Sequence, residues 1–288
     1  MLKVTPTICT QQSVDLMLTI GRIDYANCTP IFKALESVLP AGSCQFEPGV
    51  PSRLNWLLSD GAVDICPSSS IEYAQNPDRY LILPGLSISS IGAVASVLLF
   101  SSRPLEQLDG ADILLTSDSA TSVNLLKVLL KTRYGMNNRF YVSGTEHHGD
   151  IPAELQIGDR ALRTAGSGDT RHCYDLGALW HDWTGYPFVF ALWLCTRVAF
   201  RRSAAEVLDF SKNLVRAKSL ALDRLEEIAV DAPEASWMGS RRLLAYWRTN
   251  LSFDLDQRHL RGLELFYEYC AGLGLIGRVP EMHFLKGE

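Results

Sequence analysis

Short apolar runs alternate with segments of helical spacing along most of this chain, and this alternation restricts the fold more than any other feature. Apolar runs of strand length occur at residues 16–23, 61–66, 80–84, 93–100, 111–116, 155–159 and 188–193. Segments with apolar residues at helical spacing lie between several of these runs, at residues 31–36, 54–58 and 121–130. Strands that alternate with helices favour parallel sheets covered by helices on both faces, so the sequence predicts an α/β fold.

The pattern restarts near residue 105, which indicates two structural units. Two apolar strands, near residues 94–100 and 188–193, are placed to join the units as a double-strand hinge. The chain beyond residue 200 is helical, and its apolar stripes are expected to pack on the first unit. We therefore predict two lobes, the first formed by residues 16–96 together with 194–288 and the second by residues 97–193, with residues 1–15 as an N-terminal leader. In such a clamshell the ligand lies in the central cleft between the lobes.

Charge and cysteine spacing exclude several classes of protein. A net charge of -5 offers no general attraction for nucleic acid or for an anionic membrane. The seven cysteines occur singly and form no Cys-x-x-Cys pair, which favours reduced thiols in a cytoplasmic protein. The start of the sequence lacks the apolar core of a signal peptide, and no apolar run reaches the ~20 residues that a membrane span needs. We expect a soluble, cytoplasmic protein whose partner is a small molecule.

Metal and nucleophilic chemistry find little support in the sequence. We find no motif for a metal, a nucleotide or another cofactor, and expect none to be required. The adjacent His147 and His148 resemble a metal cluster by composition, but such pairs in polar loops are more often exposed. Cys28 has no histidine near it in the sequence to activate a thiol, so a packing role is favoured.

Three polar loops fall where a cleft between lobes is lined, at residues 25–29, 67–70 and 117–122. Ser68 and Ser69 in the second loop and Thr121 and Ser122 in the third offer hydroxyl and backbone donors near the start of a helix. The helix dipole favours an anion there, so these loops suit a carboxylate. Thr121 or Ser122 as a simple N-cap remains an equally good interpretation.

Helix starts elsewhere carry further expectations. Thr29 before Pro30 predicts a threonine N-cap with proline in the first turn. Asp159 follows the end of a strand, where a role in capping the next helix competes with a position facing the cleft. Glu72 lies near the second loop and is a weaker candidate for a buried acid. Trp180 and Trp183 are expected to pack near the hinge.

The sequence resembles the chorismate dehydratases of menaquinone biosynthesis over residues 21 to about 285. The resemblance is carried by several segments in the same order, namely Gly21-Arg22-Ile23-Asp24-Tyr25-Ala26-Asn27-Cys28-Thr29-Pro30-Ile31-Phe32, Asp64-Ile65-Cys66-Pro67, Gly92 to Phe100, Thr121-Ser122-Val123, Ile157 to Arg163 and Tyr174 to Ala191. A sister family with the same clamshell is marked by a Ser-Pro-Cys-Pro-Asn-type loop, which is not the loop found at residues 25–30. One departure is Ala93, which stands where many relatives have proline.

The resemblance implies a type II periplasmic-binding-protein-like fold that acts as an enzyme, a hydro-lyase of the futalosine route to menaquinone. The implied reaction removes water from chorismate and gives 3-[(1-carboxyvinyl)oxy]benzoate. The family's active-site asparagine and serine correspond to Asn27 and Ser96. The hydroxyls that hold the substrate correspond to Ser69, Thr121 and Ser122, and Ser68 and Asp159 are added as candidates beside them.

Asparagine and serine orient a substrate and donate hydrogen bonds, but they are poor bases at neutral pH. We therefore hypothesise that the enolpyruvyl carboxylate of the substrate assists removal of the C3 proton, while Asn27 and Ser96 position it and the leaving hydroxyl. The alternative is a non-catalytic binding protein or sensor that closes on a small cyclic carboxylate, because a fold alone does not decide function.

Overall fold

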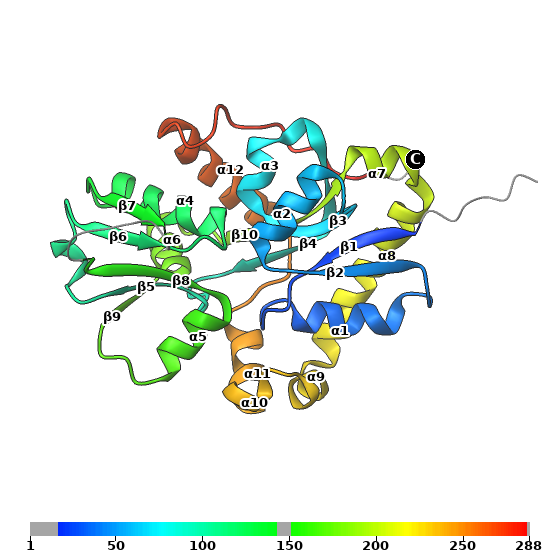
Figure 1. The fold of residues 1–288 in the computed structure, drawn as a ribbon, viewed down its shortest axis with the longest axis horizontal. Helices are drawn as coiled ribbons and strands as arrows, with labels where there is room; N and C mark the ends of the chain where they lie inside the picture. The colour runs from blue at the N-terminus through cyan, green and yellow to red at the C-terminus, as the bar shows by residue number, and fades with distance from the viewer. Residues whose placement is uncertain (1–16, 143–150, 287–288) are drawn as a thin grey trace, which may run out of the picture.

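The computed structural model describes residues 17–142 and 151–286, and these residues form two lobes, each built on a five-stranded sheet (Figure 1). The first sheet has the order β2-β1-β3-β10-β4 and the second has the order β7-β6-β8-β5-β9. The strands of the first sheet are β1 (Leu18–Arg22), β2 (Cys44–Pro48), β3 (Ile65–Ser69), β4 (Tyr80–Ser90) and β10 (Phe188–Thr196). Those of the second sheet are β5 (Val97–Ser101), β6 (Asp112–Leu115), β7 (Arg139–Val142), β8 (Ala153–Ile157) and β9 (His172–Asp175).

The helices cover the sheets in three groups. The first lobe carries α1 (Thr29–Val38), α2 (Pro51–Asp60) and α3 (Ser70–Gln75). The second lobe carries α4 (Ala120–Val128), which a π-helical turn at Leu129–Arg133 extends, α5 (Gly158–Gly166) and α6 (Leu176–Thr184). The C-terminal group consists of α7 (Arg197–Arg202), α8 (Ala204–Asp223), α9 (Leu225–Asp231), α10 (Ala235–Met238), α11 (Ser240–Thr249) and α12 (Gln257–Gly272). Short 3-10 turns lie at Pro77–Arg79 and Leu105–Gln107.

Each sheet mixes parallel and antiparallel strands. β1 pairs in parallel with β2 and β3, whereas β10 runs antiparallel between β3 and β4. In the second sheet β5 is antiparallel to both β8 and β9. The expected α/β class is therefore present, but each sheet contains an antiparallel strand that the alternation of strands and helices did not predict.

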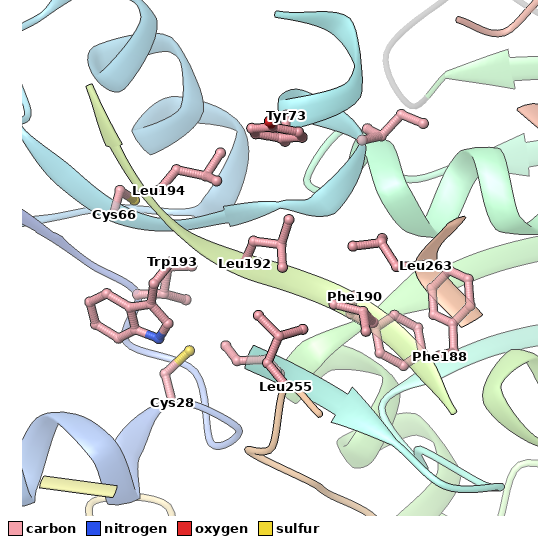
Figure 2. Close-up of a cluster of buried hydrophobic side chains, with 14 of the residues drawn as sticks. Cys28, Cys66, Tyr73, Phe188, Phe190, Leu192, Trp193, Leu194, Leu255 and Leu263 are labelled. Carbon is pink, nitrogen blue, oxygen red and sulfur yellow. The ribbon is translucent and has the colours of Figure 1, made fainter. Parts of the chain in front are cut away.

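The strand β10 corrects one sequence-based boundary. Residues 188–193 were expected in the second lobe as a hinge strand, but they belong to the first sheet. Figure 2 shows Trp193 on the Cys28 side of β10 and Leu192 and Leu194 on the opposite side. Both faces of this strand are buried, so its residues form a continuous apolar run. A strand that joins two lobes would show the same run, and the two cases look alike in the sequence. The chain crosses between the sheets in the segments 91–96 and 185–187.

The helices α9, α10 and α11 form a third packing unit beneath the junction of the lobes in Figure 1. Leu225, Leu243, Tyr246 and Trp247 bury their side chains in a cluster that is separate from the main core. This cluster also contains Ala26 from the first lobe and Leu162 from the second lobe. This unit therefore joins the β1–α1 loop of the first lobe to helix α5 of the second lobe.

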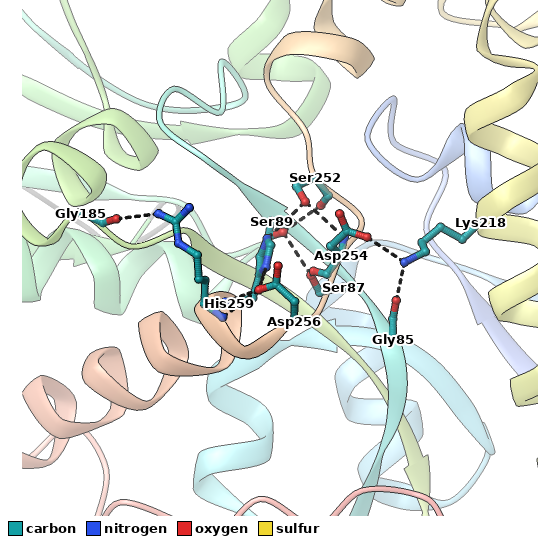
Figure 3. A network of polar contacts seen from close by, with 10 residues as sticks. Gly85, Ser87, Ser89, Gly185, Lys218, Ser252, Asp254, Asp256 and His259 are labelled. Carbon is teal, nitrogen blue, oxygen red and sulfur yellow. Dashed lines mark hydrogen bonds and ion pairs between the residues drawn. The ribbon is translucent and has the colours of Figure 1, made fainter.

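A polar network fastens the chain that leaves α11 to the end of β4 (Figure 3). The Ser89 hydroxyl donates to the carbonyl oxygen of Ser252 at 2.9 Å, and Lys218 pairs with Asp254 at 2.9 Å while also donating to the carbonyl of Gly85. Asp256 then caps α12. These contacts hold the segment 252–256 beside the strand that leads into the first crossing, and so set the position of α11.

The start of α1 differs from the prediction. Pro30 lies in the first turn as expected, but the N-cap is Cys28, and no side chain caps the helix. Thr29 is already helical, and its hydroxyl donates to the Glu234 carboxylate at 2.8 Å. Thr29 thus links α1 to the segment before α10 instead of capping its own helix.

Candidate active site

A cavity lies between the lobes and contains four of the residues that sequence analysis selected. Its empty volume is about 550 Å³, including the opening to solvent. It is lined by Ile23, Tyr25, Asn27, Cys28, Pro51, Pro67, Ser69, Ile88, Val94, Ser96, Val97, Ser119, Ser122, Ile157, Gly158, Phe190 and Ala191. A mostly apolar wall with a few convergent polar groups is typical of sites for small ligands.

Asn27 reaches the cavity from the loop between β1 and α1. Its side-chain oxygen is buried and has no hydrogen-bond partner among the described residues. A buried acceptor without a partner costs about 1–3 kcal/mol, so most such atoms in proteins are paired. The amide of Asn27 is therefore available to a donor on a bound ligand.

Ser96 ends the crossing segment between β4 and β5. Ala95 before it has a φ of 60°, a left-handed conformation that no other non-glycine residue adopts in the described ranges. Asp175, the N-cap of α6, holds this turn: its carboxylate accepts the backbone N–H groups of Val94 at 3.0 Å and Ala95 at 2.6 Å. A side chain from the second lobe thus fixes the backbone that presents Ser96.

The Ser96 hydroxyl also has a partner on the helix unit between the lobes. Tyr246 of α11 donates its phenol proton to Ser96 Oγ at 2.9 Å, and both side chains are buried. Burial raises the pKa of Tyr246 far above its ordinary value, so the phenol keeps its proton. The following residue, Trp247, donates from its indole nitrogen to the carbonyl of Ala26 at 2.7 Å, next to Asn27.

Three serines face the cavity from the other walls. Ser69 is the last residue of β3 and lies 4% exposed, and its side chain makes no capping bond. Ser119 caps α4 by accepting the backbone N–H of Ser122, and the two hydroxyls lie 3.0 Å apart. The start of α4 therefore brings two hydroxyls and the positive end of a helix dipole to the cavity, which suits a carboxylate.

Asp159 lies beside the cavity but outside its lining. Its carboxylate accepts the backbone N–H of Ala26 at 2.9 Å, and burial raises the pKa of this group. Tyr25 packs so closely on Gly158 that a Cβ added to the glycine would meet the tyrosine ring at 2.9 Å. Burial also raises the pKa of Tyr25 to about 12. These contacts join the β1–α1 loop to the start of α5 across the cleft.

The remaining predicted residues lie outside the lining of the cavity. Thr121 is fully buried, and its hydroxyl accepts the backbone N–H of Ile71 at 3.1 Å, which ties α4 to α3. Ser68 is fully buried within β3. Glu72 accepts hydrogen bonds from Asn76 and Tyr80 within the first lobe. Thr121 therefore contributes to the contact between the lobes instead of capping α4, which Ser119 does.

The candidate nucleophile Cys28 lies at the cavity, whereas the two histidines considered for a metal lie outside the described residues. Burial raises the pKa of the Cys28 thiol well above its ordinary value, so the sulfur stays protonated beside the cavity. Within residues 17–142 and 151–286 no three His, Cys, Asp or Glu side chains gather as metal ligands, and His147 and His148 lie outside these ranges. In the same ranges no helix combines the length and apolarity needed to cross a bilayer.

Sequence reasoning missed three residues that shape the site, namely Tyr246, Trp247 and Asp175. Trp247 belongs to an apolar stripe of its helix and Tyr246 follows Leu243 by three residues, so their local pattern is that of core residues. The bond from Tyr246 to Ser96 spans 150 positions in the chain, and no local signal announces it. Asp175 lies within a segment quoted for the family resemblance, but an aspartate before a helix is most simply an N-cap, which it also is.

Solved structures with similar folds include a protein of Archaeoglobus fulgidus, at a TM-score of 0.72 and 18% identity, covering 90% of this chain and 98% of that one. The periplasmic aliphatic sulphonate-binding protein of Escherichia coli is similar at a TM-score of 0.62 and 14% identity, covering 94% of both chains. These likenesses confirm the predicted two-lobed, periplasmic-binding-protein-like fold.

Similar sequences point to a single family. The chorismate dehydratase of Thermus thermophilus is 34% identical over 271 residues, covering 86% of this chain and 93% of that protein. The chorismate dehydratase of Campylobacter jejuni is 30% identical over 184 residues, covering 62% and 68% respectively. A family model described as menaquinone biosynthesis matches residues 18–272. This chain therefore belongs to the chorismate dehydratase family of menaquinone biosynthesis.

Proposed function

We propose that this protein is a chorismate dehydratase, a hydro-lyase that converts chorismate to 3-[(1-carboxyvinyl)oxy]benzoate and water in menaquinone biosynthesis. One observation carries the proposal beyond family membership. The cavity between the lobes holds the amide oxygen of Asn27, which has no partner within residues 17–142 and 151–286, and the hydroxyl of Ser96, whose backbone is fixed from the opposite lobe. The resemblance described in the sequence analysis implies that these two residues correspond to the active-site asparagine and serine of the family.

The proposed reaction is a redox-neutral elimination. The C3–H bond of chorismate breaks and its electron pair forms a ring double bond, while the C4 hydroxyl leaves with the electrons of its C–O bond. The removed proton and the leaving hydroxide together make one water, and the ring becomes aromatic. No oxidant or reductant enters this balance, so the chemistry asks the protein for orientation and for stabilisation of the leaving oxygen.

We assign the roles as follows. The Asn27 oxygen accepts the proton of the C4 hydroxyl as a hydrogen bond and so fixes its position. Ser96 donates to the same leaving oxygen as its negative charge grows. The enolpyruvyl carboxylate of the substrate takes the C3 proton, because neither Asn27 nor Ser96 is a base at neutral pH.

The ring carboxylate is proposed to bind at the wall formed by the start of α4 and the end of β3. Ser122, Ser119 and Ser69 provide hydroxyls there, and the helix dipole favours the anion. In this proposal Thr121, Ser68 and Asp159 support the walls and the contact between the lobes instead of touching the substrate.

The location of the activity is also proposed. The six cysteines in the described part of the chain are free thiols, and four of them are buried. Unpaired thiols are usual in a reducing compartment, which supports activity in the cytoplasm.

Turnover of chorismate by the purified protein, without added metal or cofactor, tests the proposal. We expect a new aromatic product, followed by chromatography and ultraviolet absorbance. Asn27→Ala and Ser96→Ala are each expected to lower kcat by about 10²–10³, the range for removing a hydrogen-bonding group aimed at an oxygen on which charge develops.

Matched control variants are Asn213→Ala and Ser211→Ala, which alter buried residues of α8 away from the cavity and are expected to keep kcat within about twofold. If Asn27→Ala retained nearly full turnover, the assignment of Asn27 would be wrong. Tight binding of chorismate without conversion would instead favour a non-catalytic binding protein or sensor.

A further inference from the structure

Tyr246 reaches the candidate catalytic serine from a part of the chain that is otherwise devoted to packing. The residue lies in α11, within the apolar cluster that bridges the lobes, and is 3% exposed. Its hydroxyl lies 2.9 Å from Ser96 Oγ, and within the described ranges this is the one hydrogen-bond partner of the phenol. The ring of Tyr246 packs in the apolar cluster, whereas its hydroxyl reaches a polar group outside that cluster, Ser96.

The direction of this hydrogen bond follows from the number of protons available. The phenol carries one proton and, being buried, keeps it. Because Ser96 Oγ is its one partner in the described part of the chain, the phenol donates and the serine oxygen accepts. A serine hydroxyl offers one donor and two acceptor sites, so Ser96 still has its own proton to donate.

The present acceptor of the Ser96 proton is a weak one. Ser96 Oγ lies 3.4 Å from the carbonyl of Val94, whereas hydroxyl hydrogen bonds are commonly about 2.7–2.8 Å long. Ser96 also lines the cavity. Its proton can therefore turn from Val94 to an oxygen of a bound ligand at little cost, while the bond from Tyr246 stays in place.

We propose that Tyr246 is a positioning residue that makes Ser96 a hydrogen-bond donor to the substrate. The inference rests on the proposed function and deepens it by assigning the polarity of the site. Tyr246 donates to Ser96 Oγ, and Ser96 donates to the leaving C4 oxygen; each proton stays on its own oxygen, so no covalent bond breaks in the relay. Hydrogen bonds in such a chain polarise one another, which makes Ser96 a stronger donor at the moment the hydroxide leaves.

The same helix reaches the neighbourhood of the second catalytic residue. Trp247 holds the carbonyl of Ala26, one residue before Asn27, so consecutive residues of α11 contact both catalytic loops. Figure 1 shows α11 beneath the junction of the two lobes. The hydroxyl of Tyr246 can be tested apart from this packing role, because Tyr246→Phe retains the ring and removes only the donor.

The test compares Tyr246→Phe with a matched tyrosine. Tyr80→Phe is the control, because Tyr80 is fully buried and donates one hydrogen bond, to Glu72 outside the cavity. We expect Tyr246→Phe to lower kcat for chorismate by about tenfold or more. This loss is smaller than the 10²–10³-fold loss typical of removing a donor that contacts the oxyanion directly. KM should change less than about threefold. The control is expected to keep kcat within about twofold, and both variants to unfold at similar temperatures.

A double-mutant cycle with Ser96→Ala separates the relay from packing. If Tyr246 acts through Ser96, Tyr246→Phe costs nothing further in the Ser96→Ala background. An equal loss in both backgrounds would overturn the inference, and so would a Tyr246→Phe variant with kcat within twofold of the parent.

The failure of the proposed function would be visible separately. If the parent protein bound chorismate without converting it, the same cycle would be measured on the dissociation constant by calorimetry. Coupling between positions 246 and 96 would then support the relay, and additivity would overturn it. Absence of both turnover and binding would overturn the function and the inference together.

Discussion

Replacing Asp175 by asparagine would disturb the turn that presents Ser96 while keeping the shape of the side chain. One carboxylate oxygen accepts the N–H groups of Val94 and Ala178, both at 3.0 Å, and the other accepts that of Ala95 at 2.6 Å. Asparagine has a single acceptor oxygen. If that oxygen keeps the first two bonds, its NH₂ group faces the N–H of Ala95, and two donors meet.

The magnitude follows from the bonds lost. A hydrogen bond to a charged group contributes about 1.5–3 kcal/mol, and leaving a buried N–H unpaired costs about 1–3 kcal/mol. These two figures partly describe the same loss, so they are not added. Burial raises the pKa of Asp175, so the folded state already disfavours the charge, and a neutral amide recovers part of the loss. We expect Asp175→Asn to lower the free energy of unfolding by about 2–3 kcal/mol.

The kcat of the folded variant should also fall, and the loss of stability alone does not explain such a fall. Ala95 is held at a φ of 60°, where alanine costs about 1–2 kcal/mol, and without its acceptor the turn can relax and carry Ser96 away from its position. Urea denaturation at neutral pH gives the stability, and turnover of chorismate by the folded variant gives kcat.

Asp256→Asn is the matched control, because Asp256 also caps a helix, α12, but lies outside the cavity, so this variant measures the cost of replacing a capping carboxylate away from the site. The reasoning would be refuted if Asp175→Asn lost no more stability than this control and kept kcat within twofold.

Two further predictions follow from particular contacts. Gly158 has a φ of 58° and packs on Tyr25, so Gly158→Ala should destabilise the protein by about 1–3 kcal/mol and weaken chorismate binding; unchanged values in denaturation and calorimetry would contradict this. Hydrogen bonds from the backbone and ring of His259 hold the pKa of Asp256 below its ordinary value. Its stabilisation is therefore present above the unfolded pKa of about 3.9 and lost as pH falls through the folded pKa. Denaturation midpoints should show the parent exceeding Asp256→Asn more at pH 6 than at pH 2.5, and an equal difference at both would count against the assignment.

The sequence predicted those parts of the fold that depend on local pattern. The strand ending at Arg22, the helix after Pro30 and the helix at residues 121–130 follow from periodicity, and the structure contains all three. The placement of β10 depends on its partners β3 and β4, which are about a hundred residues or more away in the chain, and an apolar run is the same in either lobe. The periodicity of the sequence therefore does not show to which lobe such a strand belongs.

The residues of the site also divide into those that the sequence predicts and those that depend on tertiary packing. Asn27 and Ser96 line the cavity, as do Ser69 and Ser122. Asn27, Ser69 and Ser122 lie in the three predicted polar loops, whereas Ser96 was found through the family resemblance alone. Tyr246 could not be found from a local motif, because its hydroxyl reaches Ser96 only once α11 has packed against both lobes. The proposed catalytic groups therefore lie in local motifs, whereas the groups proposed to orient them are brought there by tertiary packing.

This division explains how a binding-protein fold can carry out a reaction. A ligand-binding clamshell needs walls that match its ligand, and the serines at β3 and α4 would suffice for a carboxylate. An elimination also needs a donor already aimed at the oxygen that will leave, since a donor that reorients during the reaction contributes less. Asp175 fixes the backbone of Ser96 from one lobe and Tyr246 fixes its hydroxyl from the helices between the lobes. With both constraints present, Ser96 has one remaining freedom, to turn its proton toward the substrate.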